Sequence, residues 1–246
     1  MGADPQLLLA VVLVVAGLVR GVAGFGDALV AMPFLAVLIG PREAVPLLTA
    51  SGIVGALATG AMGFKAIDWW RAGLLLLAGV PGVGIGVWLL TWLPETLLIA
   101  IVGLVMVLFS GWSLFRPATA RLQGRPWALP FGLLAGTLGG ATSMSGPPLV
   151  IYGTACGWSP ATFRASLQVF FLVTPLVALV AQTRAGLWGP DMLARLWLAL
   201  PATAVGLLIG EVVHRRIPAH VFHRLVHGLL MVLGLLLLAQ TARSLP

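Results

Sequence analysis

Two glycine-rich interruptions inside long apolar runs constrain this chain more than any other feature of its sequence. One runs from Gly21 to Pro33 and the other from Gly136 to Pro148. Glycine frees the backbone, and proline removes a hydrogen-bond donor and clashes with the preceding turn, so we expect each stretch to break its helix. A shift of 115 residues relates the two stretches and places Gly17, Gly21, Gly24 and Pro33 on Gly132, Gly136, Gly139 and Pro148.

The apolar runs themselves are typical of an integral membrane protein. Of the 246 residues, 60% are apolar and only 9% are charged, whereas a soluble domain carries about 25% charged residues. We therefore predict an all-α polytopic membrane protein, because each run is long enough to span a bilayer as a helix. The predicted elements are 6–39, 43–63, 72–91, 95–115, 127–156, 161–182, 192–213 and 219–242, of which the first and fifth are too long for one ordinary span.

The second half of the chain echoes the first beyond the interruptions. Prolines and glycines recur in the same order at offsets that grow from 115 to 124 residues, as short loop insertions would cause. The sequence therefore predicts two homologous four-element repeats, 1–118 and 126–246, joined by a linker at 119–125. The further matching positions are Pro41 with Pro160, Pro81 and Gly86 with Pro201 and Gly206, and Pro94 with Pro218.

The arginines and lysines of the loops indicate whether each broken element crosses the membrane or turns back within it. If each broken element crosses the membrane once, the loop cations divide eight against five; if each turns back as a re-entrant hairpin, they divide nine against four. The second division is the sharper positive-inside bias, so it favours re-entrant elements and two inverted repeats, with both termini outside. Inverted repeats whose discontinuous helices meet near the bilayer midplane are a recurrent plan of secondary transporters.

Several other functions are not favoured. The net charge of +7 comes from arginines at the ends of apolar runs, so we expect no nucleic-acid partner. His220, His223 and His227 share a helical face, but no nearby carboxylate or cysteine completes a metal site. We find no phosphate-binding loop and no catalytic constellation. We therefore expect no cofactor, no metal and no enzymatic activity.

The second interruption carries polar residues ahead of its prolines, and Ser145 is placed to cap a half-helix that begins near them. The N-terminus of such a half-helix offers free N–H groups and a partial positive charge to an anion. The alternative is a plain packing motif between helices. The candidate substrate-binding residues here are Thr142, Ser143, Met144, Ser145 and Gly146.

The first interruption contains two charges, Arg20 and Asp27, with Gly24, Phe25 and Gly26 between them, and all five are candidate substrate-binding residues. A charge deep in the bilayer costs roughly 3 kcal/mol or more and is functional by default. A break at the glycines would fold the two charges together, with Arg20 facing the substrate and Asp27 as a capping group or proton carrier. The alternatives are a structural ion pair and an Arg20 that extends to the membrane interface.

Four polar residues of later elements are weaker candidates. Glu211 is a candidate for proton coupling, with an interfacial salt bridge as the alternative. Gln168 and Thr174 are placed to line a cavity, although a lone glutamine is more often a helix–helix hydrogen bond. Arg164 could guard a cytoplasmic mouth, but anchoring a loop is the commoner role.

The stretch from Gly24 to Pro33, the second glycine-rich stretch, the loop Ile67-Asp68-Trp69, and Pro81 with Gly86 resemble the sulfite exporter TauE/SafE family. The resemblance extends over nearly the whole chain. It implies a multi-pass carrier of the inner membrane that exports sulfite or small organosulfur or carboxylate anions, driven by the proton gradient.

Residues and resemblance together predict a secondary transporter that exports small anions by alternating access. An anion channel or a non-transporting membrane subunit is the alternative. The expected partners are the anion and the lipid bilayer, and a homodimer is left open.

Overall fold

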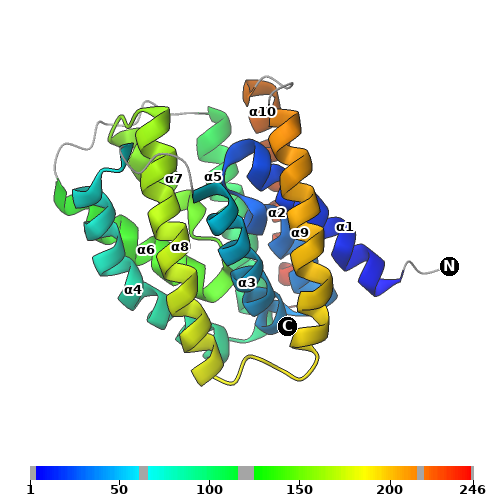
Figure 1. The fold of residues 1–246 in the computed structure, drawn as a ribbon. Helices are drawn as coiled ribbons and strands as arrows, with labels where there is room; N and C mark the ends of the chain where they lie inside the picture. Colours follow the sequence, from blue (N-terminus) through cyan, green and yellow to red (C-terminus); the bar gives the residue numbers. More distant parts are fainter. Residues whose placement is uncertain (1–3, 61–65, 116–124, 215–218, 245–246) are drawn as a thin grey trace.

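The computed structural model describes residues 4–60, 66–115, 125–214 and 219–244, and every regular element in these ranges is a helix (Figure 1). The predicted all-α class is confirmed. In chain order the elements are α1 (Pro5–Ala23), α2 (Asp27–Leu38), α3 (Pro41–Gly60), α4 (Trp69–Trp92), α5 (Glu95–Phe115), the 3-10 helix η2 (Arg125–Trp127), α6 (Ala128–Thr142), α7 (Gly146–Ala155), α8 (Pro160–Arg184), α9 (Met192–His214) and α10 (Ala219–Ser244).

Six of the described helices are long and apolar enough to cross a membrane, namely α1, α4, α5, α8, α9 and α10. Their outward faces carry large apolar side chains. Leu77, Leu208 and Trp197 are 68%, 66% and 82% exposed, respectively. Such a surface suits contact with lipid, since large apolar patches are rare on soluble monomers.

Both predicted breaks are confirmed. The first long element divides into α1 and α2 at Gly24 and Gly26, which adopt φ of 83° and 97°. The second divides into α6 and α7 at Ser143, whose φ of 58° is the one positive value outside glycine in the described ranges. Left-handed backbone ends a helix because it cannot continue the right-handed turn.

The positions of the breaks differ from the glycine pattern by one helical turn. The left-handed residues that end α1 and α6 are Gly24 and Ser143, which are 119 residues apart rather than 115. Gly139 stays inside α6, and the second break lies just ahead of Pro147 and Pro148, which occupy the first turn of α7. The expected cap is also wrong, because Ser145 takes the N-cap position without a capping hydrogen bond from its side chain.

Glycines pack α1 directly against α9. A Cβ atom on Gly17 would meet the Thr203 carbonyl, and one on Gly21 would meet the Leu207 carbonyl. The backbones therefore touch, and the rising numbers on both helices show that α1 and α9 run in parallel. Gly206 and Gly210 face α1 in the same way, so this pair serves helix packing.

The same construction joins α6 to α4. Three glycines of α6 have no room for a side chain because the α4 backbone lies against them, and their order along both helices is again parallel. The α6 contacts are Gly132 with Leu75, Gly136 with Gly79, and Gly140 with Val83.

Helices α5 and α10, by contrast, pack antiparallel, with Gly103 against Gly234 and Gly111 against Met231.

Contacts between helix ends show that the first broken element doubles back. An ion pair between Glu43 and Arg195 places the start of α3 beside the start of α9. Because α1 runs parallel to α9, its start lies at that same end of the bundle. The chain enters α3 directly after α2, so α2 returns to the end from which α1 departed.

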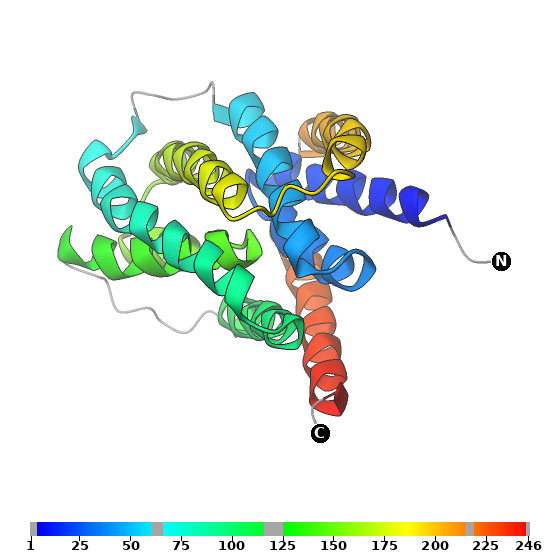
Figure 2. The ribbon, with the colours of Figure 1, turned by 90° about the horizontal axis from the view of Figure 1, so that it is seen from below.

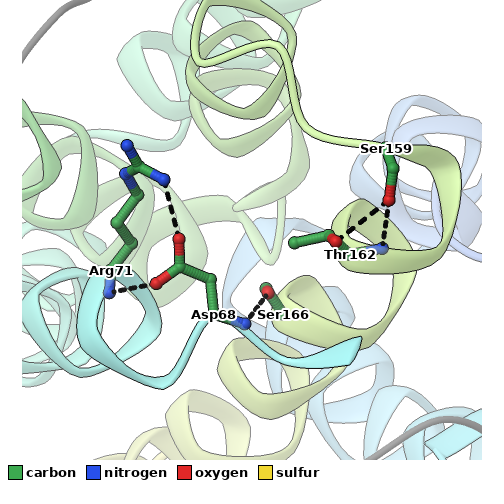
Figure 3. A network of polar contacts seen from close by, with 5 residues as sticks. All are labelled: Asp68, Arg71, Ser159, Thr162 and Ser166. Carbon is green, nitrogen blue, oxygen red and sulfur yellow. Dashed lines mark hydrogen bonds and ion pairs between the residues drawn. The ribbon is translucent and has the colours of Figure 1, made fainter. Parts of the chain in front are cut away.

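The second broken element also doubles back, as the polar contacts at the starts of α4 and α8 indicate (Figure 3 shows these contacts). Asp68 caps α4 by accepting from the Arg71 backbone N–H at 3.1 Å, and the Asp68 N–H donates to Ser166 Oγ in α8 at 3.0 Å. The start of α4 therefore lies beside the start of α8, which Ser159 caps by accepting from the Thr162 N–H. Since α6 runs parallel to α4, α7 returns to the end from which α6 departed. Seen from below, α8 lies between α3 and α4 (Figure 2).

Candidate functional site

The two helix breaks line one cavity of about 60 Å³, room for several water molecules at roughly 10–15 Å³ each. Four helices or helix ends of the first half and three of the second contribute to its wall. The central expectation from the sequence, that the two interruptions come together, is therefore met. The lining residues are Arg20, Phe25, Gly26, Asp27, Ala28, Leu29, Leu48, Thr49, Gly52, Val83, Gly139, Ser143, Met144, Ser145, Gly146, Phe171, Thr174, Pro175 and Ala178.

A buried ion pair forms the positive side of the cavity. Arg20, in the last turn of α1, donates from Nη1 to Asp27 Oδ2, in the first turn of α2, at 2.7 Å. The expectation that the break folds these two charges together is confirmed. Arg20 is 4% exposed, and its Nε and Nη2 atoms are buried without a hydrogen-bond partner. Buried polar atoms are normally paired, so this guanidinium is equipped to bind a further acceptor.

Glycine on α3 makes space for this guanidinium. A Cβ atom on Gly55 would lie 2.5 Å from Arg20 Nε and 2.7 Å from its Cδ. No side chain fits at that position while Arg20 keeps its place. The charge is thus held between α1 and α3.

The second break is fixed by hydroxyl groups. Ser143 Oγ donates to the Val45 carbonyl of α3 at 3.0 Å, and Thr49 Oγ1 donates to the same carbonyl at 2.9 Å. Gln182 of α8, which is fully buried, donates from Nε2 to Thr49 Oγ1 at 3.0 Å. The sequence reasoning missed Thr49 and Gln182, because single polar residues in apolar helices carry no pattern that distinguishes a site from a packing contact.

Three of the predicted substrate-binding residues, Gly24, Gln168 and Thr142, are not part of the cavity lining. Gln168 Nε2 donates to the Gly24 carbonyl at 3.1 Å, so it supports the first break from α8. Thr142 is buried, and its hydroxyl donates to the Leu138 carbonyl one turn earlier. Thr174, by contrast, lines the cavity while donating to the Phe170 carbonyl.

Helix N-termini add partial positive charge at the cavity. The first turn of α2 contributes Asp27, Ala28 and Leu29 to the wall, and α7 contributes Gly146. The first N–H groups of a helix have no partner within it, and they attract anions. Because positions 147 and 148 are proline, α7 offers fewer such donors than α2.

The remaining candidates lie elsewhere. Glu211 is on the α9 face that packs against Gly21 of α1, outside the cavity lining. His227 is buried against Phe109 of α5, with ring centroids 5.3 Å apart. The side chains of His220 and His223 fall outside the described residues. Among the residues that are described, no group of three potential ligands could hold a metal ion.

Comparisons with known proteins agree with this architecture. The model of the sulfite exporter TauE/SafE family matches residues 9–237. The chain is 28% identical over 150 residues to a probable sulfite/organosulfonate exporter TauE of Cupriavidus necator, covering 59% of this chain and 58% of that protein. It is 26% identical over 179 residues to a probable inner membrane transporter protein TsaS of Comamonas testosteroni, covering 72% and 74%.

No solved structure matches the chain. The family match, however, spans nearly all of it and includes both helix breaks, the ion pair and the α3 and α8 residues that line the cavity. This multi-pass membrane protein belongs to the sulfite exporter TauE/SafE family, which is a family of transporters and not of enzymes.

Proposed function

We propose that this protein is a secondary transporter that exports small anions, such as sulfite, an organosulfonate or a small carboxylate, across the inner membrane. The observation that carries the proposal is the buried Arg20 guanidinium, which has two unpartnered nitrogen atoms and lies where two broken helices meet. The names of the two relatives point to the same substrate class and the same membrane.

Two inverted repeats account for the matching positions and contacts of helices in the two halves of the chain. The spacing of 119 residues that separates Gly24 from Ser143 also separates the starts of α2 and α7, and of α3 and α8. Gly82 and Gly86 of α4 meet α6 as Gly206 and Gly210 of α9 meet α1. This offset of 124 residues differs by one helical turn from the pairing of Gly86 with Gly206 that the sequence predicts. These correspondences support repeats over 1–118 and 126–246, with 119–125 as the linker.

The orientation follows from the loop cations. Re-entrant broken elements place nine loop arginines and lysines at the end of the bundle where α4, α6, α8 and α10 begin, and four at the other end. We assign the first end to the cytoplasm, since cationic loops stay inside. Both termini then lie on the periplasmic side.

Asp27 links anion binding to proton binding. In the empty cavity its carboxylate neutralises Arg20, and an entering anion must compete with it for the guanidinium. Protonation of Asp27 releases Arg20 and leaves the site neutral once the anion is bound, which avoids a net buried charge; the proton then crosses the membrane in the same direction as the anion. Glu211, outside the cavity lining, has no part in this cycle.

The test is uptake of labelled sulfite into proteoliposomes. Wild-type protein is expected to give saturable uptake that is stimulated by unlabelled sulfite inside, and Arg20→Gln is expected to abolish it. Arg243→Gln, an exposed residue in the last turn of α10, is the control and should behave as wild type. Linear flux without counterflow would indicate a channel, and no flux would indicate a non-transporting subunit; either contradicts the proposal.

A further inference from the structure

The side chain of Arg164, in the second turn of α8, lies beside Gly24, the residue that ends α1. A Cβ atom built on Gly24 would lie 3.4 Å from Arg164 Nε and 3.6 Å from Nη2. The residue is exposed, and no other residue that the structure describes forms a hydrogen bond or ion pair with it. Its N–H donors are therefore available to a ligand arriving from the aqueous phase.

An aromatic residue directly follows the glycine that Arg164 approaches. This residue, Phe25, lines the cavity and meets Phe163 edge-on with ring centroids 6.5 Å apart. It also packs against the second half of the chain, since a Cβ atom on Gly146 would lie 3.4 Å from Phe25 Cδ2. Phe25 is therefore adjacent in the chain to the residue beside Arg164, and it shares the cavity wall with Arg20.

Phe25 lies on backbone that belongs to neither helix. Gly24 and Gly26 flank it and have φ of 83° and 97°, a region that costs glycine little. The ring is half-buried, so its displacement would give up only part of its apolar contact. Phe25 is thus joined to α1 and α2 through glycines and is part of neither helix.

We propose that Arg164 is a capture site for the transported anion on the side of the membrane where α8 begins, and that Phe25 is the closed gate between this site and Arg20. The inference rests on the proposed transport of small anions. An exposed cation at the mouth of a cleft raises the local concentration of anions and their rate of entry. Such a cation contributes little to the translocation steps that follow anion binding. Its removal should therefore raise KM and leave the maximal rate nearly unchanged.

The experiment measures initial rates of labelled sulfite uptake into everted membrane vesicles, whose cytoplasmic face is outward. Arg164→Gln is expected to raise KM about threefold to tenfold at low ionic strength, with a maximal rate within about twofold of wild type. The difference should shrink at 0.5 M salt, because salt screens exposed charges. Arg164→Lys should restore most of the affinity, and Arg184→Gln, an exposed cation at the far end of the same helix, should leave KM unchanged.

Two results would overturn the capture site. One is an unchanged KM in Arg164→Gln at low salt. The other is a lowered maximal rate that Arg164→Lys does not rescue, which would make Arg164 a structural support of the α1 break. Phe25→Ala separately tests the gate, and should allow sulfite to equilibrate without counterflow; tight coupling in that variant contradicts the gate. Absence of saturable uptake in wild-type vesicles would remove the proposed function itself, and this inference with it.

Discussion

Removing the charge of Asp27 is expected to destabilise the protein more than removing the charge of Arg20. The three variants that show this are Asp27→Asn, Arg20→Gln and the double substitution. Each single variant leaves one charge of the pair without its partner, while the double variant leaves two neutral amides that can still hydrogen-bond. The comparison separates the structural role of the pair from its role in transport.

The exposed fractions of the two side chains determine how much unfolding free energy each variant is expected to lose. Breaking a fully buried ion pair by removing one partner costs about 3–5 kcal/mol. After Asp27→Asn the unpaired guanidinium is 4% exposed, so we expect about 3 kcal/mol. After Arg20→Gln the unpaired carboxylate is 15% exposed on the cavity wall, where water can reach it, so we expect about 2 kcal/mol. In the double variant the losses should fall short of their sum by about 2 kcal/mol, as for groups in direct contact.

The assay pairs unfolding of the purified variants in detergent with sulfite counterflow in proteoliposomes. The double variant should be about as stable as Asp27→Asn alone, instead of losing the sum of the two effects, whereas its transport should be abolished, because no guanidinium remains to bind the anion. Asp27→Asn should retain exchange but lose its dependence on the proton gradient. Counterflow in the double variant, or stability losses that simply add, would refute the role assigned to this pair.

The glycines of α6 give a second prediction: Gly136→Leu should prevent α6 from packing on α4 and destabilise the protein by more than 2 kcal/mol, about the level of a severe packing error, since the Gly79 carbonyl occupies the space. Gly84→Ala, where nothing lies within 4 Å, should be neutral or stabilising by up to about 1 kcal/mol, and equal unfolding temperatures for the two variants would contradict this packing. At the second break, Ser143→Gly relieves the positive φ but loses the hydrogen bond to Val45, so we expect a folded protein with weaker sulfite binding, measured as a raised KM. Ser143→Ala loses the same hydrogen bond and keeps the positive φ, so it should be about 1 kcal/mol less stable than Ser143→Gly. Full activity in both variants would show that the hydroxyl is dispensable.

Hydrophobicity and helix-breaking residues allowed most of the fold to be predicted. A run of about 20 apolar residues in a membrane has few options besides a helix, because lipid offers no hydrogen-bond partners to the backbone. Glycine at 24 and 26 and proline at 147 and 148 lie at the observed breaks, whereas Pro33, which the sequence also counted toward the first break, lies inside α2. The spacing of the glycines did not predict where α6 ends, because Gly132, Gly136 and Gly140 pack against α4 and do not break the helix.

The candidate site was only partly predictable. Arg20 and Asp27 stood out because charge is rare and costly in an apolar helix, and the structure pairs them. Thr49 and Gln182 did not stand out, because their importance depends on which residues of other helices face them. Glu211 was a candidate on charge alone, yet it lies on the face of α9 that packs against α1.

The amino-acid sequence alone indicates that this chain lies in a membrane, that its first and fifth apolar elements are broken, and that two opposite charges flank the first break. These are local properties, set by the transfer of side chains and unpaired backbone groups from water to lipid. The packing of the helices is what places both breaks at one cavity, leaves Arg20 with two nitrogen atoms that have no hydrogen-bond partner, and brings Arg164 beside Gly24. Those facts depend on how helices more than 100 residues apart pack against one another, and no short stretch of sequence encodes such packing.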